Sequence, residues 1–408
     1  MNLNSFEEKL QVWLEHPKTF KLLLAIVSAL SVLFLVQTYR KAYRAIGYDL
    51  TSYLLSSEAL LAGANPYQTD TVFPYIYPLF LCVAMVPLAL VPYWLAVFVW
   101  FGMCLGALFY SATLLLRLYN PELPAKKRGV LFGVSFLFMY AIFSSNFLNG
   151  QINPIILLLA VLFIYYYLKS DKGKATWFLS AAIIIKLTPA IFLMYLFLKR
   201  DFKYLLLVLG QCLVLGLLVP WLFAGNKVWE WYGYYLDIFL KPKLAGQSED
   251  IGPVPFAVVH FVNYVLPQLP KLVAFAVSAL LVLLPILYVQ LVNHEALKKD
   301  KVKNLLLFCL YMLAMLLISP MSEKHHLVHV YPAIMVMIGT MALASGSAAN
   351  LKLNLWLLGA VVLLLLFGQM LPFGYLVAVL LCYVFVFRQL VLLRAGKIAM
   401  LGTGYEGW

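Results

Sequence analysis

Charged side chains are scarce in this sequence. Only 12% of its 408 residues are Asp, Glu, Lys or Arg, and 64% are hydrophobic, whereas an average soluble domain has roughly 25% charged residues and roughly half apolar ones. Several apolar runs of roughly 17 to 24 residues are each long enough to span the core of a bilayer as a helix. The composition therefore excludes an ordinary soluble protein. It predicts an all-α polytopic membrane protein with one integral membrane domain over residues 1–408.

The sequence also argues against a nucleotide-binding site, a nucleic-acid-binding surface and a cysteine metal site or disulfide. The chain has no glycine-rich phosphate loop, which argues against a nucleotide site. Its net charge of +13 would suggest nucleic acid in a soluble protein, but these basic residues cluster in short loops, where they set topology and contact anionic headgroups. We therefore expect membrane lipids, and no nucleic acid, as partners. The cysteines lie within apolar runs without metal-ligand spacing, so we expect buried thiols without disulfides. They are Cys82, Cys104, Cys212, Cys309 and Cys382.

The basic clusters predict how the chain crosses the membrane. They lie at residues 126–128, 169–174, 199–203, 298–303 and 388–397. By the positive-inside rule they share the cytoplasmic face of the inner (plasma) membrane, and both termini are cytoplasmic. The first loop (residues 40–77), a hairpin at 149–153, a later segment (222–270) and a histidine pair at 325–326 then face outward. We expect about 11 to 13 transmembrane or re-entrant helices, without an internal repeat.

The segment between Lys174 and Lys199 is too short for two ordinary spans, although both of its ends carry cytoplasmic-type charge. Its middle reads Lys186-Leu187-Thr188-Pro189, and proline interrupts a helix. We predict two half-helices that enter and return, with Lys186 at membrane depth beside a cavity. A lysine at that depth is usually paired or directed at a ligand. The alternative is one kinked span with residues 199–203 outside.

The first external loop contains a helix and many aromatic side chains. Residues 49–61 have the periodicity of a helix that lies on the membrane surface, and the turn residues at 63–67 end it. Tyr48, Tyr75 and Tyr77 flank this helix. Asp49 begins it, either as an N-cap or as a general base that accepts a proton from an attacking hydroxyl.

His325 and His326 lie in a polar break between two apolar runs, at residues 319–326. Polar groups at a membrane boundary cost free energy unless they meet water, each other or a ligand. Imidazole can donate hydrogen bonds to a phosphate, and Lys324 adds positive charge. The alternative is a helix cap in a solvated loop. Adjacent side chains on a helix point about 100° apart, so the pair is a poor metal site.

The remaining polar candidates have two interpretations each. Arg44 binds a lipid phosphate or only extends its side chain from the first span to the interface. Asn149, Gln151 and Asn153 bind a substrate at their hairpin tip or form an ordinary turn.

A base, several cations and external aromatic faces fit sugar transfer from a lipid-linked sugar phosphate. The base takes the proton of the acceptor hydroxyl, and the cations stabilise the departing phosphate. The cavity and its charges would also suit a secondary transporter of a small anionic or sugar substrate. A transporter would show related halves and polar groups spread through the membrane, and this sequence shows neither. A non-catalytic scaffold is a third possibility, and it predicts that Asp49 is dispensable.

Several motifs occur in the order seen in one enzyme family. They are Tyr48-Asp49-Leu50, GANPY at 63–67, FPYIYP at 73–78, Gly150-Gln151-Ile152-Asn153, Lys186 to Pro189, Gln247-Ser248 and SPMSEKHH at 319–326. On these motifs the chain resembles glycosyltransferase family 87, membrane enzymes of the GT-C fold that include mannosyltransferases using polyprenyl-phosphate mannose. Two positions depart from the family pattern. Gly246 replaces an asparagine before Gln247, and Glu323 replaces a tryptophan after Ser322.

The resemblance implies an inverting transfer of mannose or another hexose from a polyprenyl-phosphate donor to a lipid-linked or glycan acceptor. Asp49 would be the base, and His325 or His326 would hold the donor phosphate with Lys186 and Arg44. The resemblance implies further substrate contacts from Tyr48, Tyr75, Tyr77, Asn149, Gln151, Asn153, Gln247, Ser248, Ser322 and Lys324. It implies no metal and no cofactor, with a divalent cation at Asp49 as the alternative.

Overall fold

The computed structural model describes residues 17–44, 48–71, 73–241, 256–292, 297, 300–343 and 348–394, and these residues form helices and connecting turns without a strand. The first half contains α2 (Pro17–Arg44), α3 (Asp49–Leu61), α4 (Leu79–Ala89), α5 (Tyr93–Tyr119), α6 (Ala125–Phe138), α7 (Tyr140–Leu148), α8 (Asn153–Leu168), α9 (Lys172–Ile185), η1 (Thr188–Ala190) and α10 (Ile191–Leu198). The second half contains α11 (Phe202–Leu213), η2 (Val214–Leu218), α12 (Val219–Ala224), α13 (Lys227–Tyr235), η3 (Leu236–Leu240), α15 (Val258–Val265), α16 (Lys271–Val292), α18 (Lys301–Ile318), η4 (Lys324–Val330), α19 (Tyr331–Leu343), α20 (Ala348–Phe367), η5 (Gly368–Met370) and α21 (Gly374–Arg394).

Six helical stretches among the described residues are long and apolar enough to cross a bilayer. They are Tyr93–Tyr119, Phe202–Ala224, Lys271–Val292, Lys301–Ile318, Lys352–Met370 and Gly374–Leu393. Helices α6 and α7, which meet at 71°, form a seventh span if they are counted together. Helices α4 and α8 and the segment η1–α10 are shorter apolar segments. The predicted all-α, polytopic membrane architecture is therefore confirmed.

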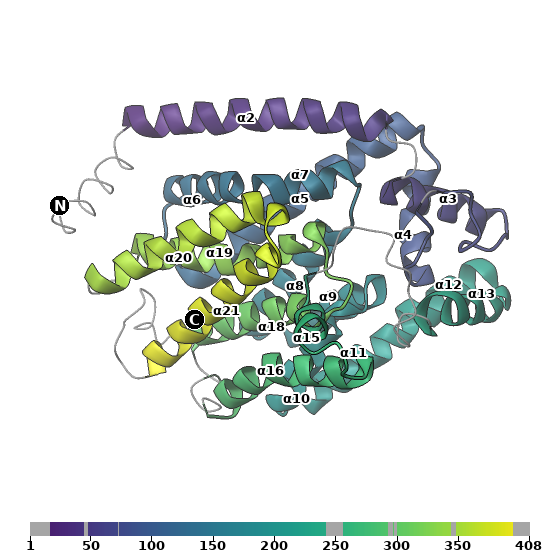
Figure 1. The fold of residues 1–408 in the computed structure, drawn as a ribbon. Helices are drawn as coiled ribbons and strands as arrows, with labels where there is room; N and C mark the ends of the chain where they lie inside the picture. The colour runs from purple at the N-terminus through teal and green to yellow at the C-terminus, as the bar shows by residue number, and fades with distance from the viewer. Residues whose placement is uncertain are drawn as a thin grey trace.

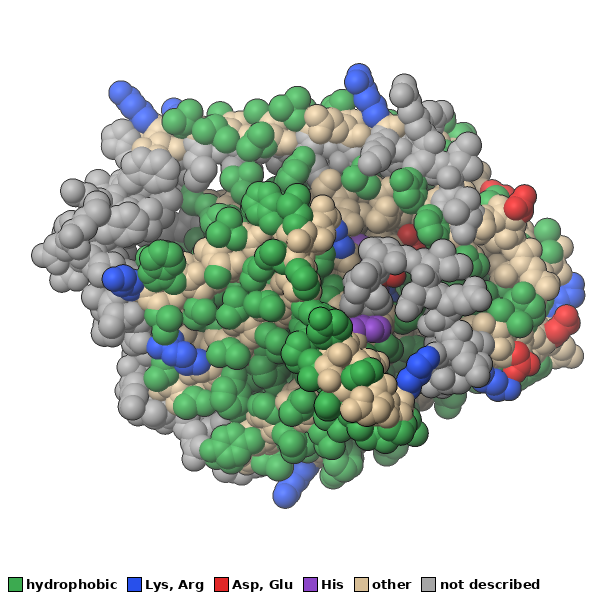
Figure 2. Space-filling model, in the orientation of Figure 1, with side chains coloured by type: hydrophobic (Ala, Val, Ile, Leu, Met, Phe, Trp, Pro, Cys, Tyr) green, Lys and Arg blue, Asp and Glu red, His purple; other side chains and the backbone are tan. Residues whose placement is uncertain are grey.

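Helix α18 forms the centre of the bundle, with α5, α8, α19 and α21 around it (Figure 1). From Leu305 onward its sequence is apolar on every face, and 83% of the span is buried, as expected of a helix without a polar side. Helix α16 is also apolar, but only 28% of its span is buried, so its outer face suits contact with lipid. Figure 2 shows hydrophobic side chains over much of one face, with most of the visible Lys and Arg side chains toward its margins.

The break predicted at Lys186 is confirmed. Helix α9 ends at Ile185, Lys186 is extended, and a short 3-10 turn leads into α10. At the far ends of these half-helices, the Lys172 ammonium lies 3.0 Å from the Asp201 carboxylate. The chain therefore enters and returns to the same end of the bundle, and the alternative of one kinked span is wrong.

Two polar regions lie at opposite ends of α8. Near its C-terminus, Tyr167 donates a hydrogen bond to Asp201, and the neighbouring Lys199 ammonium donates to Asn304 Oδ1 over 2.5 Å. Its N-terminal residue, Asn153, belongs to the second region. Sixteen helical residues separate the two by about 24 Å along the axis. The basic loops at 169–174 and 199–203 therefore lie at the opposite end of α8 from Asn153 and its partner Lys186.

Candidate active site

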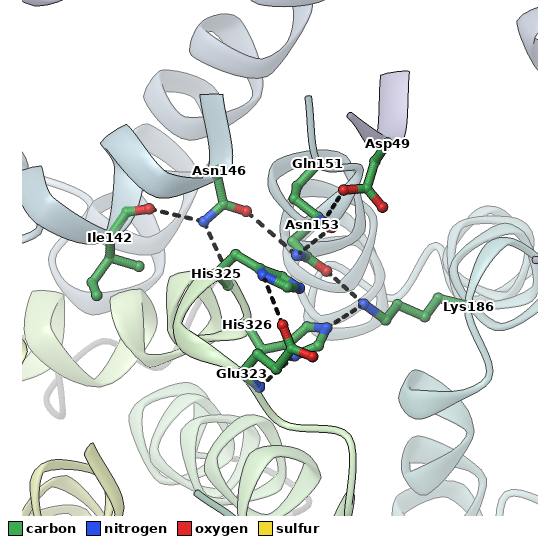
Figure 3. A network of polar contacts seen from close by, with 9 residues as sticks. All are labelled: Asp49, Ile142, Asn146, Gln151, Asn153, Lys186, Glu323, His325 and His326. Atoms are coloured by element: carbon green, nitrogen blue, oxygen red, sulfur yellow. Dashed lines mark hydrogen bonds and ion pairs between the residues drawn. The ribbon is translucent and has the colours of Figure 1, made fainter. Parts of the chain in front are cut away.

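Four chain segments converge on one polar cluster (Figure 3). They are the first turn of α3 with Asp49, the α7–α8 hairpin, the break after α9 with Lys186, and the 3-10 turn η4 with the two histidines. The segments are up to 277 positions apart in the sequence, from Asp49 to His326. The fold thus unites polar groups that would each be costly alone in an apolar bundle.

A hydrogen-bond chain connects the Asp49 carboxylate to the Lys186 side chain. Gln151 Nε2 donates to Asp49 Oδ2 over 2.6 Å, and Asn153 Nδ2 donates to Gln151 Oε1 over 3.2 Å. Lys186 Nζ then donates to Asn153 Oδ1 over 2.8 Å. Both amide side chains are buried, so each must satisfy its donors and acceptors within the site.

Asn146 fixes the direction of this chain. Its Nδ2 donates to the carbonyl oxygens of Ile142 and His325, over 2.9 and 2.8 Å. Carbonyls only accept, so Asn146 Oδ1 must face Asn153 and accept from Asn153 Nδ2 at 3.4 Å. Asn153 Oδ1 is then left to accept from Lys186. The order of donors from Lys186 to Asp49 follows from backbone groups and does not depend on an arbitrary choice of amide orientation.

The sequence did not single out Asn146. It lies within an apolar helix, α7, without the spacing of any motif. One signal was available: Asn146 is a single amide side chain in a helix of mostly apolar residues, four residues before the Gly150 turn. A buried amide is costly unless it has hydrogen-bond partners, so its presence there suggested a structured polar site.

The α7–α8 hairpin packs directly against the start of α3. The Asp49 N–H donates to the Asn149 carbonyl over 3.1 Å, and Trp100 Nε1 donates to the Gly150 carbonyl over 3.1 Å. Gly150 has φ +64°, and a Cβ there would lie 2.6 Å from the Leu50 Cβ. Only glycine combines this backbone conformation with so close an approach. The hairpin therefore sets the position of the Asp49 backbone as well as its carboxylate.

The turn η4 places His326 between two partners. Its Nδ1 accepts the backbone N–H of Glu323 over 2.8 Å, and its Nε2 lies 2.7 Å from Lys186 Nζ. The helix-cap alternative for the pair is thus partly right, because His326 does cap the turn, but the same ring also reaches Lys186. The centroids of the His325 and His326 rings are 4.2 Å apart. His325 Nδ1 lies 3.6 Å from the Glu323 carboxylate.

The electrostatics of the site favour a basic carboxylate and neutral imidazoles. Desolvation raises the pKa of Asp49 to about 6, although the Lys186 charge acts in the opposite direction. Desolvation, with Lys186 acting in the same direction, lowers the pKa of His325 to about 3. The same two causes hold the pKa of His326 and of the buried His329 well below the ordinary value. Asp49 does not cap α3, because Tyr48 is the N-cap residue and the Asp49 carboxylate faces Gln151.

The other predicted residues occupy varied positions. The Tyr48 ring stacks on Phe73 with 6.4 Å between centroids. Tyr77 lies at the site, where Lys186 Nζ is 5.9 Å from its ring centroid. Tyr75 is fully buried, and its hydroxyl donates to the Pro78 carbonyl.

The remaining candidates lie farther from this network or outside the described residues. Ser322 is buried and donates to the Leu316 carbonyl, and Lys324 donates to Gln369 Oε1 over 3.2 Å. Arg44 belongs to α2, but its side chain lies outside the described residues, as do Gln247 and Ser248.

Within the described part of the chain, no three His, Cys, Asp or Glu side chains are grouped as a metal site. The prediction of a reaction without metal stays a prediction, and so does its alternative of a cation at Asp49. One Asp49 oxygen is already occupied by the Gln151 amide, which fits an oriented base.

Comparison with known proteins points to one family. The sequence model of glycosyltransferase family 87 matches residues 75–320. A polyprenol-phosphate-mannose-dependent alpha-(1-2)-phosphatidylinositol mannoside mannosyltransferase of Mycobacterium tuberculosis is 27% identical over 224 residues. This match covers 52% of the present chain and 48% of the relative, so the chain spans about half of that protein's length.

Proposed function

This chain belongs to glycosyltransferase family 87, and we propose that it transfers mannose or another hexose from a polyprenyl-phosphate donor to a hydroxyl of a lipid-linked or glycan acceptor. The chain is a membrane glycosyltransferase by family, and its relative uses polyprenol-phosphate mannose. The observation that carries the proposal is the directed hydrogen-bond chain between the Asp49 carboxylate and the Lys186–His326 pair. It holds a base and a phosphate-directed group in one rigid network.

Asp49 is the proposed base. Its raised pKa, about 6, makes it more basic than an ordinary carboxylate while it stays ionised at neutral pH. Gln151 donates to one carboxylate oxygen, which orients the group and leaves the other oxygen for the acceptor hydroxyl. As that hydroxyl attacks the anomeric carbon, its proton moves to Asp49, and the bond between the anomeric carbon and the phosphate oxygen breaks.

Lys186 and His326 are the proposed phosphate donors. The negative charge that develops on the departing phosphate is best stabilised by donors that are already in position. Attack by the acceptor on the face opposite to the phosphate inverts the anomeric configuration. Tyr48, which precedes Asp49 and is only half-buried, has an aromatic ring against which a sugar ring can pack.

We place this reaction on the external side of the membrane. The support is the separation of the Asp49 cluster from the basic loops at the other end of α8, together with the positive-inside rule. The acceptor then belongs to glycolipid or cell-envelope glycan synthesis.

The test is a transfer assay with the purified protein in lipid nanodiscs, short-chain polyprenyl-phosphate mannose and a panel of glycolipid acceptors. The matched variant is Asp49→Asn, which keeps the shape of the side chain and its contact with Gln151. Transfer by the wild type and its loss in the variant support the proposal. Uptake of sugar into sealed vesicles without transfer would instead favour the transporter alternative.

A further inference from the structure

The contacts of His326 determine where its ring proton lies. The ring is neutral in its desolvated surroundings, so it carries one N–H. Nδ1 faces the backbone N–H of Glu323 at 2.8 Å, and this group can only donate. The Met321 backbone also acts on the ring, but it is the smallest of the influences on the pKa of His326. Nδ1 must therefore present its lone pair, and the single proton lies on Nε2.

A proton on Nε2 constrains the state of Lys186. Nε2 lies 2.7 Å from Lys186 Nζ, and an ammonium offers three donors and no acceptor. If Lys186 were charged, two donors, its ammonium and the His326 Nε2–H, would face each other at hydrogen-bond distance with no acceptor between them. A neutral amine removes the conflict, because its lone pair accepts from Nε2–H. The amine can still donate to Asn153 Oδ1, 2.8 Å away, and the network set by Asn146 requires that donation (Figure 3).

We propose that Lys186 and His326 form a proton-coupled phosphate site, in which Lys186 is a neutral amine in the empty protein and takes up one proton from solvent when the phosphodiester of a lipid-linked sugar binds. The inference rests on the proposed function and adds a protonation step to donor binding. On protonation, the hydrogen bond between the imidazole and the amine breaks. The Lys186 ammonium and the His326 Nε2–H then both donate to phosphate oxygens, and the new positive charge pairs with the negative charge of the diester.

The groups that face Lys186 come from three other segments. Asp49 is the acidic group that interacts with Lys186, and Glu323 acts on Asp49 within the same cluster. Tyr77 presents its ring, and His325 and His329 are neutral imidazoles. The carboxylates favour the ammonium, whereas desolvation and the donor on His326 favour the amine. Because these influences oppose each other, one additional negative charge is sufficient to shift the balance.

Proton uptake makes donor affinity depend on pH with a defined sign. If binding consumes one proton, the affinity rises as the pH falls, by up to about tenfold per pH unit while Lys186 is the amine in the free protein. This dependence is opposite to that of the Asp49 base, which loses its function as the pH falls. The two groups can therefore be separated by measuring binding and turnover independently.

The experiment is isothermal titration calorimetry of the Asp49→Asn protein with farnesyl-phosphoryl mannose. The diester has no titrating group near neutral pH, so it cannot supply or consume the proton itself. The Asp49→Asn change prevents turnover and removes the Asp49 carboxyl group, which interacts with Lys186, as a proton source. Titrations at about pH 8 in HEPES and in Tris, which differ in ionisation enthalpy and contain no phosphate to compete for the site, give the number of protons taken up. We expect a value close to one, and a value close to zero overturns the inference.

Two variants at the pair test its chemistry in the same background. His326→Gln places an amide oxygen near the position of Nε2, where it accepts from an ammonium. Lys186→Arg carries a permanent charge. Both should bind the diester with little or no proton uptake. Lys203→Met, which removes an exposed lysine of α11, is the matched control and should leave the uptake unchanged.

The outcomes separate the inference from the function beneath it. Binding without uptake in the parent protein, or full uptake in His326→Gln, refutes the proton coupling while the proposed transfer stands. If the diester does not bind, and the wild type transfers no sugar from it, the proposed function fails and the inference fails with it.

Discussion

The carboxyl group of Asp49 predicts a pH dependence that an ordinary aspartate would not produce. With a pKa of about 6 beside a charged Lys186, which is the state proposed for the donor complex, about nine-tenths of the group is ionised at pH 7 and about one-tenth at pH 5. An aspartate with the model-peptide pKa of about 3.9 would stay more than nine-tenths ionised at pH 5. Only the ionised form can accept the proton of the acceptor hydroxyl. We therefore expect kcat to fall about tenfold between pH 7 and pH 5.

The assay is the initial rate of mannosyl transfer at saturating donor and acceptor, measured across this range with purified protein in nanodiscs. Saturation matters because kcat reports groups in the complex with substrate, and it removes the opposite pH dependence expected for donor binding. Asp49→Asn should lower kcat by about 10²–10⁴-fold, or roughly 3 to 5 kcal/mol, and abolish the acid limb. A wild-type kcat that stays constant from pH 7 to pH 5, or an Asp49→Asn enzyme within a few fold of wild type, would refute the assignment.

Five further substitutions test other parts of the site and the topology. His326→Ala should lower kcat/KM for the lipid donor by at least about tenfold, or roughly 1.4 kcal/mol. His325→Ala should do less, because the ring nitrogen that lies 2.7 Å from Lys186 Nζ belongs to His326. Donor-titration kinetics on both variants decide this. Asn146→Leu should lower kcat with little change in donor KM, because it releases the amide chain and leaves the substrate contacts in place; equal loss in both constants would contradict a positioning role. Gly150→Ala should lower the thermal unfolding midpoint, since a Cβ there meets its neighbour at 2.6 Å, and an unchanged midpoint would show that the hairpin relaxes. A cysteine at Lys172 should resist an impermeant thiol reagent added from outside, and labelling would invert the proposed topology.

The sequence predicted the main elements of this site because each had a local physical signal. Turn residues ended the helix at 49–61, and the structure has α3 at Asp49–Leu61. A proline three positions after Lys186 predicted the break that the structure shows. The charge pattern of the loops predicted which polar residues share one end of the bundle. These signals depend on neighbours in the chain, so one sequence was sufficient.

Other features depend on contacts between distant segments, and no local pattern encodes them. The 71° bend between α6 and α7 occurs at Met139, without a proline. Tyr75 looked like a substrate-binding aromatic in the external loop, yet its ring is fully buried, a position set by residues elsewhere in the chain. Asn146 was missed for the same reason, since its partners, His325 and Asn153, lie in other helices or turns.

The protonation states also depend on these distant contacts. In the sequence, Lys186 was a cation at membrane depth and His326 was half of a pair with two possible roles. In the structure, the Glu323 backbone N–H fixes the His326 tautomer, and that tautomer determines which form of Lys186 can lie 2.7 Å away. Substituting Glu323 by tryptophan would keep this backbone N–H while removing a carboxylate from the same cluster. The proton uptake on donor binding should therefore persist in Glu323→Trp, but its onset should move to lower pH, because one influence that favours the ammonium is lost. Calorimetry of that variant at several pH values would show the shift, and an onset at higher pH would mean that Glu323 does not act on Lys186 by its charge.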